Sequence, residues 1–171
     1  MDGSWLDTWR TVHVIAVVVF LVGHAVSMYA GFRFKSVSTV EQAKGVLELS
    51  RKGLLVAYLG LLVTIVAGIL AGIAGQWFTS GRWWIWAAIV VLVVVTVAMS
   101  FMAAVPMAGI RWQLGATPTR SPKELEKKFG PAGQGTARLA ELQAAWNPIP
   151  TAIVGLVGLA ILLWLMYTKP F

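Results

Sequence analysis

The residues of this chain best suited to chemistry are its two histidines, His13 and His24, which lie in an uncharged apolar run over residues 11–32. An α-helix turns by about 100° per residue, so these two side chains share one face and lie about 16 Å apart along the helix axis. A neutral imidazole is a good ligand for haem or a metal ion, and an ionisable group inside a membrane generally has a functional role. His13 and His24 are therefore the candidate cofactor-binding residues, with haem b as the candidate cofactor.

Two imidazoles separated by about 16 Å cannot both bind one iron atom. A haem would then need a histidine with a methionine, a histidine with a backbone or water ligand, or a histidine from a second protein copy. The alternative interpretation is structural, with each imidazole bonded to a backbone or hydroxyl group and stabilising the bundle. On chemistry alone, the candidate methionines are Met28, Met99, Met102, Met107 and Met166.

Other kinds of reactive site find little support in the sequence. Nucleotide-binding motifs, paired catalytic carboxylates, the metalloprotease HExxH motif and Ser-His-Asp sets are not present. The chain has no cysteine, which excludes disulfides, thiolate metal sites, iron–sulfur clusters and thioether-linked haem. We therefore expect no catalytic residues, and the sequence leaves metal binding undetermined.

The composition is that of a membrane protein, with 58% hydrophobic and only 12% charged residues and a mean hydropathy of +0.76. Soluble domains have about a quarter of their residues charged. The net charge of +7 does not indicate a nucleic-acid partner, because the basic residues cluster beside apolar runs. The first ten residues lack the basic region of a cleaved signal peptide, so we expect the first helix to remain in the mature protein.

Charge-free apolar runs predict four membrane-spanning helices, each long enough to cross a bilayer core of about 30 Å. They form an all-α fold, an antiparallel four-helix bundle in one domain over residues 1–171. Pro106 should kink or end the third helix, leaving residues 107–114 along the inner membrane surface. The predicted spans lie near 10–33, 52–76, 83–110 and 149–168.

The two longer connections should contain short amphipathic helices. Ser38 and Glu41 have capping-box spacing, and an amphipathic stretch over residues 40–49 leads into the second span. Ser121 has the same spacing to a glutamate and is followed by proline, which suits a helix start. Another short helix is predicted over residues 136–146.

The distribution of basic residues predicts the orientation. Residues 33–52 and 111–141 together contain eleven Lys and Arg, whereas the opposite side has only Arg10, Arg82 and Lys169. Basic loops stay in the cytoplasm, so both termini should lie outside. Most of the tryptophans fall near the predicted outer ends, as an aromatic belt does. We expect a multi-pass protein of the bacterial cytoplasmic (inner) membrane.

Small residues recur every four positions on two of the predicted spans. Such stripes let helix backbones approach closely, so we expect them to pack helices within the bundle or against a partner. A glycine-lined substrate path is the alternative. No acidic residue lies inside a span, which argues against a proton relay or a cation-coupled carrier. The candidate helix-packing residues are Gly23, Ser27, Gly31, Gly60, Thr64, Gly68 and Gly72.

Two short motifs resemble those of small bacterial four-span membrane proteins of unknown function. One is WRTVHVIAVV over residues 9–18, with Gly23 after it; the other comprises AWN before the last span and LMYTKP at its end. The group includes copper-resistance-D-like domains and, more distantly, the four-helix membrane protoporphyrinogen oxidase. The resemblance implies that His13 is the histidine placed around a haem in those oxidases, whereas His24 is additional. The lysine that those oxidases need in their third span has no counterpart in residues 83–110.

The sequence thus favours a non-catalytic membrane protein, an accessory or assembly subunit of a larger membrane complex. Its expected partners are membrane lipids, other membrane subunits or a second copy of itself, and not nucleic acid. The alternative is a b-type haem protein that transfers electrons or handles porphyrin through His13, His24 or both. A third hypothesis, a permease for small molecules or metal ions, is supported only by the resemblance to copper-associated proteins.

Overall fold

The computed structural model describes residues 3–133 and 135–169, and within them every regular element is a helix. Four helical segments are long and apolar enough to cross a membrane. This confirms the predicted all-α, multi-pass membrane fold. The spanning segments are α1 (Gly3–Arg33), α2 (Val40–Ala74), α3 (Trp83–Met99) with its continuation, and α7 (Pro148–Thr168).

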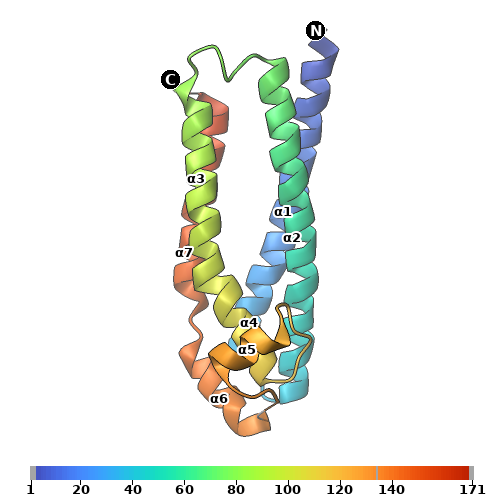
Figure 1. The fold of residues 1–171 in the computed structure, drawn as a ribbon, viewed down its shortest axis with the longest axis vertical. Coiled ribbons are helices and arrows are strands. Elements are labelled where there is room, and N and C mark those ends of the chain that lie inside the picture. The colour runs from blue at the N-terminus through green and yellow to red at the C-terminus, as the bar shows by residue number, and fades with distance from the viewer. Residues whose placement is uncertain (1–2, 134, 170–171) are drawn as a thin grey trace.

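The spanning helices are arranged as two antiparallel pairs, α1 with α2 and α3 with α7 (Figure 1). Both described termini lie at one end of the molecule, here called the terminal end. The short helices α5 (Pro122–Phe129) and α6 (Gly135–Ala145) lie at the opposite end, here called the capped end. The two pairs lie close together at the capped end and diverge toward the terminal end.

The α1/α2 pair is held at very short range because glycine lies at its crossing points. A Cβ atom on Gly23 would lie 2.5 Å from the backbone nitrogen of Ala57, and one on Gly60 would lie 2.6 Å from that of Phe20. No real Cβ fits at such distances, so the two backbones are in direct contact. Close backbone approach of this kind is what drives helix association in lipid.

The third span is interrupted by the π-helical turn η2 (Ser100–Ala104), after which α4 (Val105–Gln113) changes direction (Figure 1). Pro106 has no backbone N–H, so it cannot bond the Met102 carbonyl four residues back. That carbonyl accepts a long bond of 3.5 Å from the Thr151 hydroxyl of α7 instead. Residues 107–111 are all buried within the protein, so this stretch is covered by other parts of the chain, and its position along the inner membrane surface stays a prediction.

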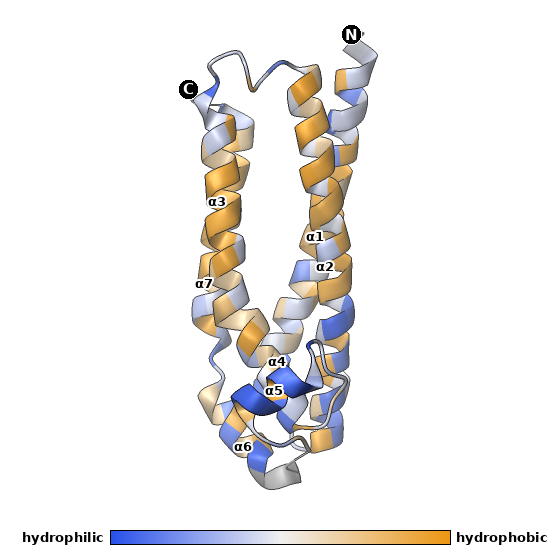
Figure 2. Cartoon of the chain, in the orientation of Figure 1, coloured by the Kyte–Doolittle hydropathy of each residue, from blue (hydrophilic) through white to orange (hydrophobic). Residues whose placement is uncertain are grey.

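The capped end contains the main hydrophobic core, which joins the two helix pairs. Trp146 is buried and its indole N–H donates to the Gly31 carbonyl at 2.9 Å. The Gln143 amide donates to the carbonyls of Phe34 and Val37, each at 2.8 Å. The charged residues collect around this core, whereas the spanning helices are apolar (Figure 2). The core residues are Phe34, Val37, Ala43, Leu47, Met107, Ile110, Leu114, Leu139, Leu142 and Trp146.

The helix starts differ in detail from those predicted. The N-cap of α2 is Thr39, whose hydroxyl accepts from the Gln42 backbone N–H at 3.2 Å, so the capping box proposed for Ser38 and Glu41 was wrong by one residue. Ser121 is the N-cap of α5 but makes no side-chain capping bond. From Val40 the helix continues without a break into the second span.

Candidate functional site

His13 is bonded to the neighbouring helix. Its Nδ1 atom lies 2.8 Å from the backbone carbonyl oxygen of Thr64 in α2. A carbonyl oxygen can only accept, so Nδ1 carries the proton and, in the neutral ring, Nε2 keeps its lone pair. Gly68 makes room for the ring, because a Cβ there would lie 3.0 Å from Nδ1. Metal-binding histidines are commonly oriented by such a bond, and so are structural ones.

His24 points to a different pair of helices. Its ring stacks on Phe20, with ring centroids 5.7 Å apart, and its Nε2 lies 3.3 Å from the position that a Cβ on Gly155 of α7 would occupy. The sulfur of Met99 in α3 lies 3.8 Å from that same position. Helices α1, α3 and α7 therefore bring His24, Met99 and Gly155 together, next to the irregular turn η2.

The structure does not bring the two histidines together, because His13 faces α2 and His24 faces α3 and α7. Among the methionines considered from sequence, Met99 shares the Gly155 contact with His24, since its sulfur and the His24 Nε2 atom both lie within 4 Å of the position of a Cβ on Gly155. An imidazole with a thioether is a ligand pair that suits haem iron. No group of three or more His, Asp or Glu side chains that could hold a metal ion occurs in residues 3–133 and 135–169.

The His24 ring lacks the hydrogen-bond partner that we expect for an imidazole in the middle of a membrane span. The sequence predicts a bonding partner for a deeply placed imidazole, since an unpaired polar group there is unfavourable. Among the described residues no hydrogen bond to the His24 ring is present, and its ring contact is with Phe20. The His24 imidazole is half-buried and thus remains able to bind a group outside the described residues.

The small-residue stripes lie inside the molecule. Gly23 and Gly60 form the closest α1/α2 contacts, and the hydroxyl oxygens of Ser27 and Ser50 lie 3.1 Å apart across the same interface. Gly31 faces the Trp146 ring at 3.7 Å, and Gly72 faces the Phe78 ring. The Thr64 carbonyl accepts a hydrogen bond from His13, and Gly68 leaves room for the His13 ring. Because these residues pack against the chain itself, contact with a partner has to use other surfaces.

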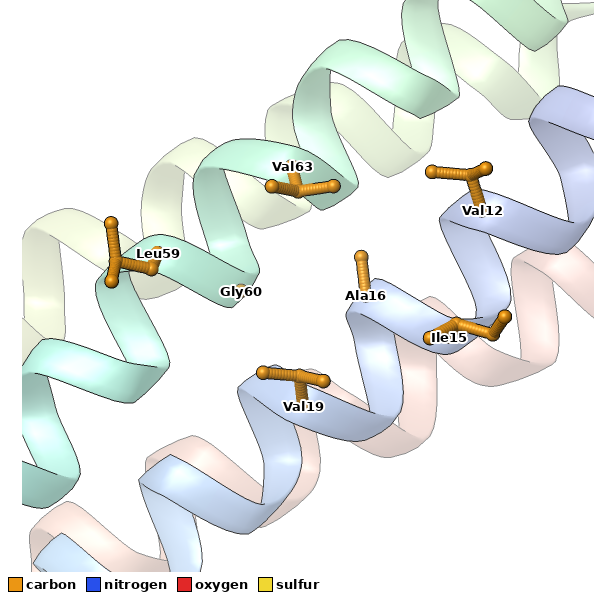
Figure 3. A pocket seen from close by; sticks show the side chains of 7 residues that line it. All are labelled: Val12, Ile15, Ala16, Val19, Leu59, Gly60 and Val63. Carbon is orange, nitrogen blue, oxygen red and sulfur yellow. The ribbon is translucent and has the colours of Figure 1, made fainter.

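A shallow apolar groove runs along the outside of the α1/α2 pair (Figure 3). Its volume is about 280 Å³, and it opens between the valine side chains of α1 and those of Leu59 and Val63 because Ala16 and Gly60 fill so little space. No polar side chain lines it, so it offers no chemistry and suits a lipid chain. The lining residues are Val12, Ile15, Ala16, Val19, Leu59, Gly60 and Val63.

Sequence reasoning did not identify Gly155 or the full environment of Arg111. Gly155 has no reactive group, and only its position opposite His24 and Met99 gives it a role. In the sequence, Arg111 is one of the eleven basic residues that predict the cytoplasmic side, whereas the structure leaves it only 1% exposed. Its burial follows from the folding of α4 into the capped-end core, which no local pattern predicts.

The chain matches no protein-family model, no curated protein and no solved structure. Its functional features are therefore those of its own geometry: the His13–Thr64 bond, the cluster of His24, Met99 and Gly155, and the exposed surface of the spanning helices.

Proposed function

We propose that this chain is a non-catalytic membrane protein that serves as an accessory or assembly subunit of a larger membrane complex. The main support is the third span, which the rest of the chain covers very little. Only 6% of its apolar stretch is buried, compared with 11% for α1 and for α7 and 22% for α2, and no residue of 89–106 is buried. A span this poorly covered, ending in an irregular turn, has ample surface for another protein.

The uncovered surface is called here the exposed face of α3. One helix stripe carries large apolar side chains, and Phe101 at its end is 72% exposed. Thr96 lies beside this face, is exposed, and forms no side-chain hydrogen bond to the described residues. Hydroxyl groups in membrane helices commonly bond across helix interfaces, which favours a protein partner over lipid alone. The face comprises Val90, Val93, Val94, Val97 and Phe101.

Extraction of the natively expressed protein in a mild detergent tests this function. The complex should have a mass well above that of the single chain and contain at least one other membrane subunit. Deletion of the chain should lower the amount or activity of that complex. A lone monomer, with no complex affected by the deletion, would overturn the proposal.

A second candidate is a b-type haem protein that transfers electrons or handles porphyrin. It is favoured by one observation, the placement of the Met99 sulfur and the unbonded His24 ring around Gly155. In this case His24 and Met99 would hold the iron, and His13 would serve the helix contact. The absorption spectrum of protein purified from haem-replete cells tests whether haem is bound. No Soret band and no pyridine haemochrome would exclude this candidate.

We further propose that the protein resides in the bacterial inner membrane with both termini outside, as the resemblance to small bacterial four-span proteins also suggests. The structure is compatible with this orientation because both basic connections lie at the capped end (Figure 1). Reporter fusions after residue 171 check it: an exported enzyme should be active, and a fluorophore that matures only in the cytoplasm should be dark. The reverse pattern would overturn this topology.

A further inference from the structure

A second cavity, of about 440 Å³, lies at the capped end between α2, α4 and the loop that leads to α5. One part of its wall is strongly basic, with the side chains of Arg51, Arg111 and Arg120. The other part is apolar and includes Leu55 and Tyr58, both more than half exposed on the outside of α2. The cavity therefore combines cationic groups with a surface that continues onto the membrane-spanning helix.

Arg111 is the unusual member of this set. Its side chain is among the largest fully buried ones of the chain, with 1% exposure. Its two terminal nitrogens are buried, and neither has a hydrogen-bond partner among the described residues. A buried guanidinium without a partner is strongly unfavourable, so an anion at this position would remove a large penalty.

The charged neighbours of Arg111 do not supply that anion. The groups that act on it electrostatically are Glu48 and Arg51, which have opposite signs. The Glu48 carboxylate is already engaged by Arg51, whose Nε lies 2.9 Å from Oε2 and whose terminal nitrogen lies 2.6 Å from Oε1. Arg120 contacts Glu124 only at 3.4 Å and at the surface. The cavity thus keeps a cationic group with free donors.

Arginine binds phosphate well, because its planar N–H groups match two phosphate oxygens at once. The lining residues of α2 indicate which phosphate fits. Arg51, Leu54, Leu55 and Tyr58 follow the helical spacing of one face, so this face is basic at its start and apolar as it enters the span. A ligand that follows this face has an anionic head and an apolar tail.

We propose that this cavity binds the phosphate group of an anionic membrane phospholipid, with Arg111 as the principal phosphate ligand. Arg51 and Arg120 flank the headgroup, and the acyl chains lie over Leu55 and Tyr58. Basic residues at this level of a membrane protein are well placed for anionic lipid. The cavity distinguishes this site from general surface attraction, because its central cation is buried.

Native mass spectrometry of the full-length protein, stripped of lipid in a neutral detergent, tests the site. Phosphatidylglycerol is titrated in one arm, diacylglycerol with the same chains in a second, and glycerol phosphate in a third. Phosphatidylglycerol should bind about tenfold or more tightly than either, since only it carries both the phosphate and the acyl chains. Equal binding of diacylglycerol would contradict a phosphate site, and equal binding of glycerol phosphate would assign the cavity to a soluble phosphate compound.

Three variants locate the binding. Arg111→Gln should weaken phosphatidylglycerol binding by about tenfold or more, and Arg120→Gln by about threefold to fivefold. Lys123→Gln removes the same charge from exposed α5 without lining the cavity, and its binding should equal that of the unmodified chain. If Arg111→Gln does not fold, Arg120→Gln tests the site instead, because Arg120 is exposed and its substitution should not prevent folding. Unchanged affinity in the folded variants, or an equal loss in Lys123→Gln, overturns the proposal.

Discussion

The Nδ1 atom of His13 lies 2.8 Å from the backbone carbonyl oxygen of Thr64, a bond that joins α1 to α2 across 51 positions of sequence. The contact is possible because Gly68, one turn further along α2, has no side chain in the way of the ring. His24, eleven residues later on the same helix, has no such bond within the described residues. We therefore expect substitution by leucine to have opposite effects on stability at these two positions.

His13 should tolerate glutamine better than leucine. His13→Gln keeps an N–H donor for the Thr64 carbonyl, whereas His13→Leu loses the bond and should lower the free energy of unfolding by about 1 kcal/mol. Thermal unfolding in a mild detergent, followed by circular dichroism, measures the difference. Equal stability of the two variants would mean that the bond contributes nothing.

His24→Leu should be neutral or stabilising, because it removes a half-buried polar ring that has no partner in the described part of the chain. The same unfolding measurement compares it with His13→Leu. A loss at His24→Leu as large as at His13→Leu would indicate that a bound group stabilises His24. Colour that disappears equally in His24→Gln and His24→Leu would identify that group as haem, since an amide is a poor iron ligand.

Gly23→Ala should destabilise the protein by about 1–3 kcal/mol, because the added methyl group would overlap the α2 backbone at Ala57. Gly45→Ala is the matched control, since Gly45 is also helical but has nothing within 4 Å of the added Cβ. Removing a helical glycine there should stabilise by about 0.5–1 kcal/mol. The melting temperatures of the two variants should thus move in opposite directions, and a shift in the same direction would contradict the backbone contact.

Trp146→Phe should cost about 1–3 kcal/mol, because it leaves the Gly31 carbonyl without the indole donor in the capped-end core. Trp83→Phe is the control, since Trp83 is 70% exposed and surface substitutions change stability by about 0.5 kcal/mol or less. Unfolding temperatures again provide the measurement. If both variants melt alike, the bond between Trp146 and Gly31 does not stabilise the capped-end core.

The four spanning helices could be predicted because an uncharged run longer than the bilayer core has few other stable structures. The start of α2 could not be placed in the same way. Charge marks where the membrane surface lies, but the helix itself begins at Val40 after the Thr39 cap and passes through charged residues before it enters the span. The divergence of the two helix pairs was also not predictable, because the apolar runs do not specify which faces touch.

The sequence identified which residues could form the candidate site, but it did not predict how they are arranged in space. His13 and His24 could be placed on one face of α1, yet their neighbours depend on how α1 crosses α2, α3 and α7. Met99 was one of five chemically equivalent methionines until packing placed it beside His24. Arg111 looked like a surface cation by its position at the end of an apolar run, and only the fold of α4 buries it.

The docking of a membrane subunit on the exposed face of α3 is tested most directly by a photo-crosslinking residue at Val94 or Phe101. Leu62 on α2, which is as exposed as Val94, is the control outside this face. The chain should be expressed at its native level and irradiated in intact membranes. We expect a discrete protein adduct from Val94 and Phe101, identified by mass spectrometry as a subunit of the complex that the deletion diminishes, and none from Leu62. Correctly inserted protein that gives no protein adduct at Val94 or Phe101 would contradict the proposed function.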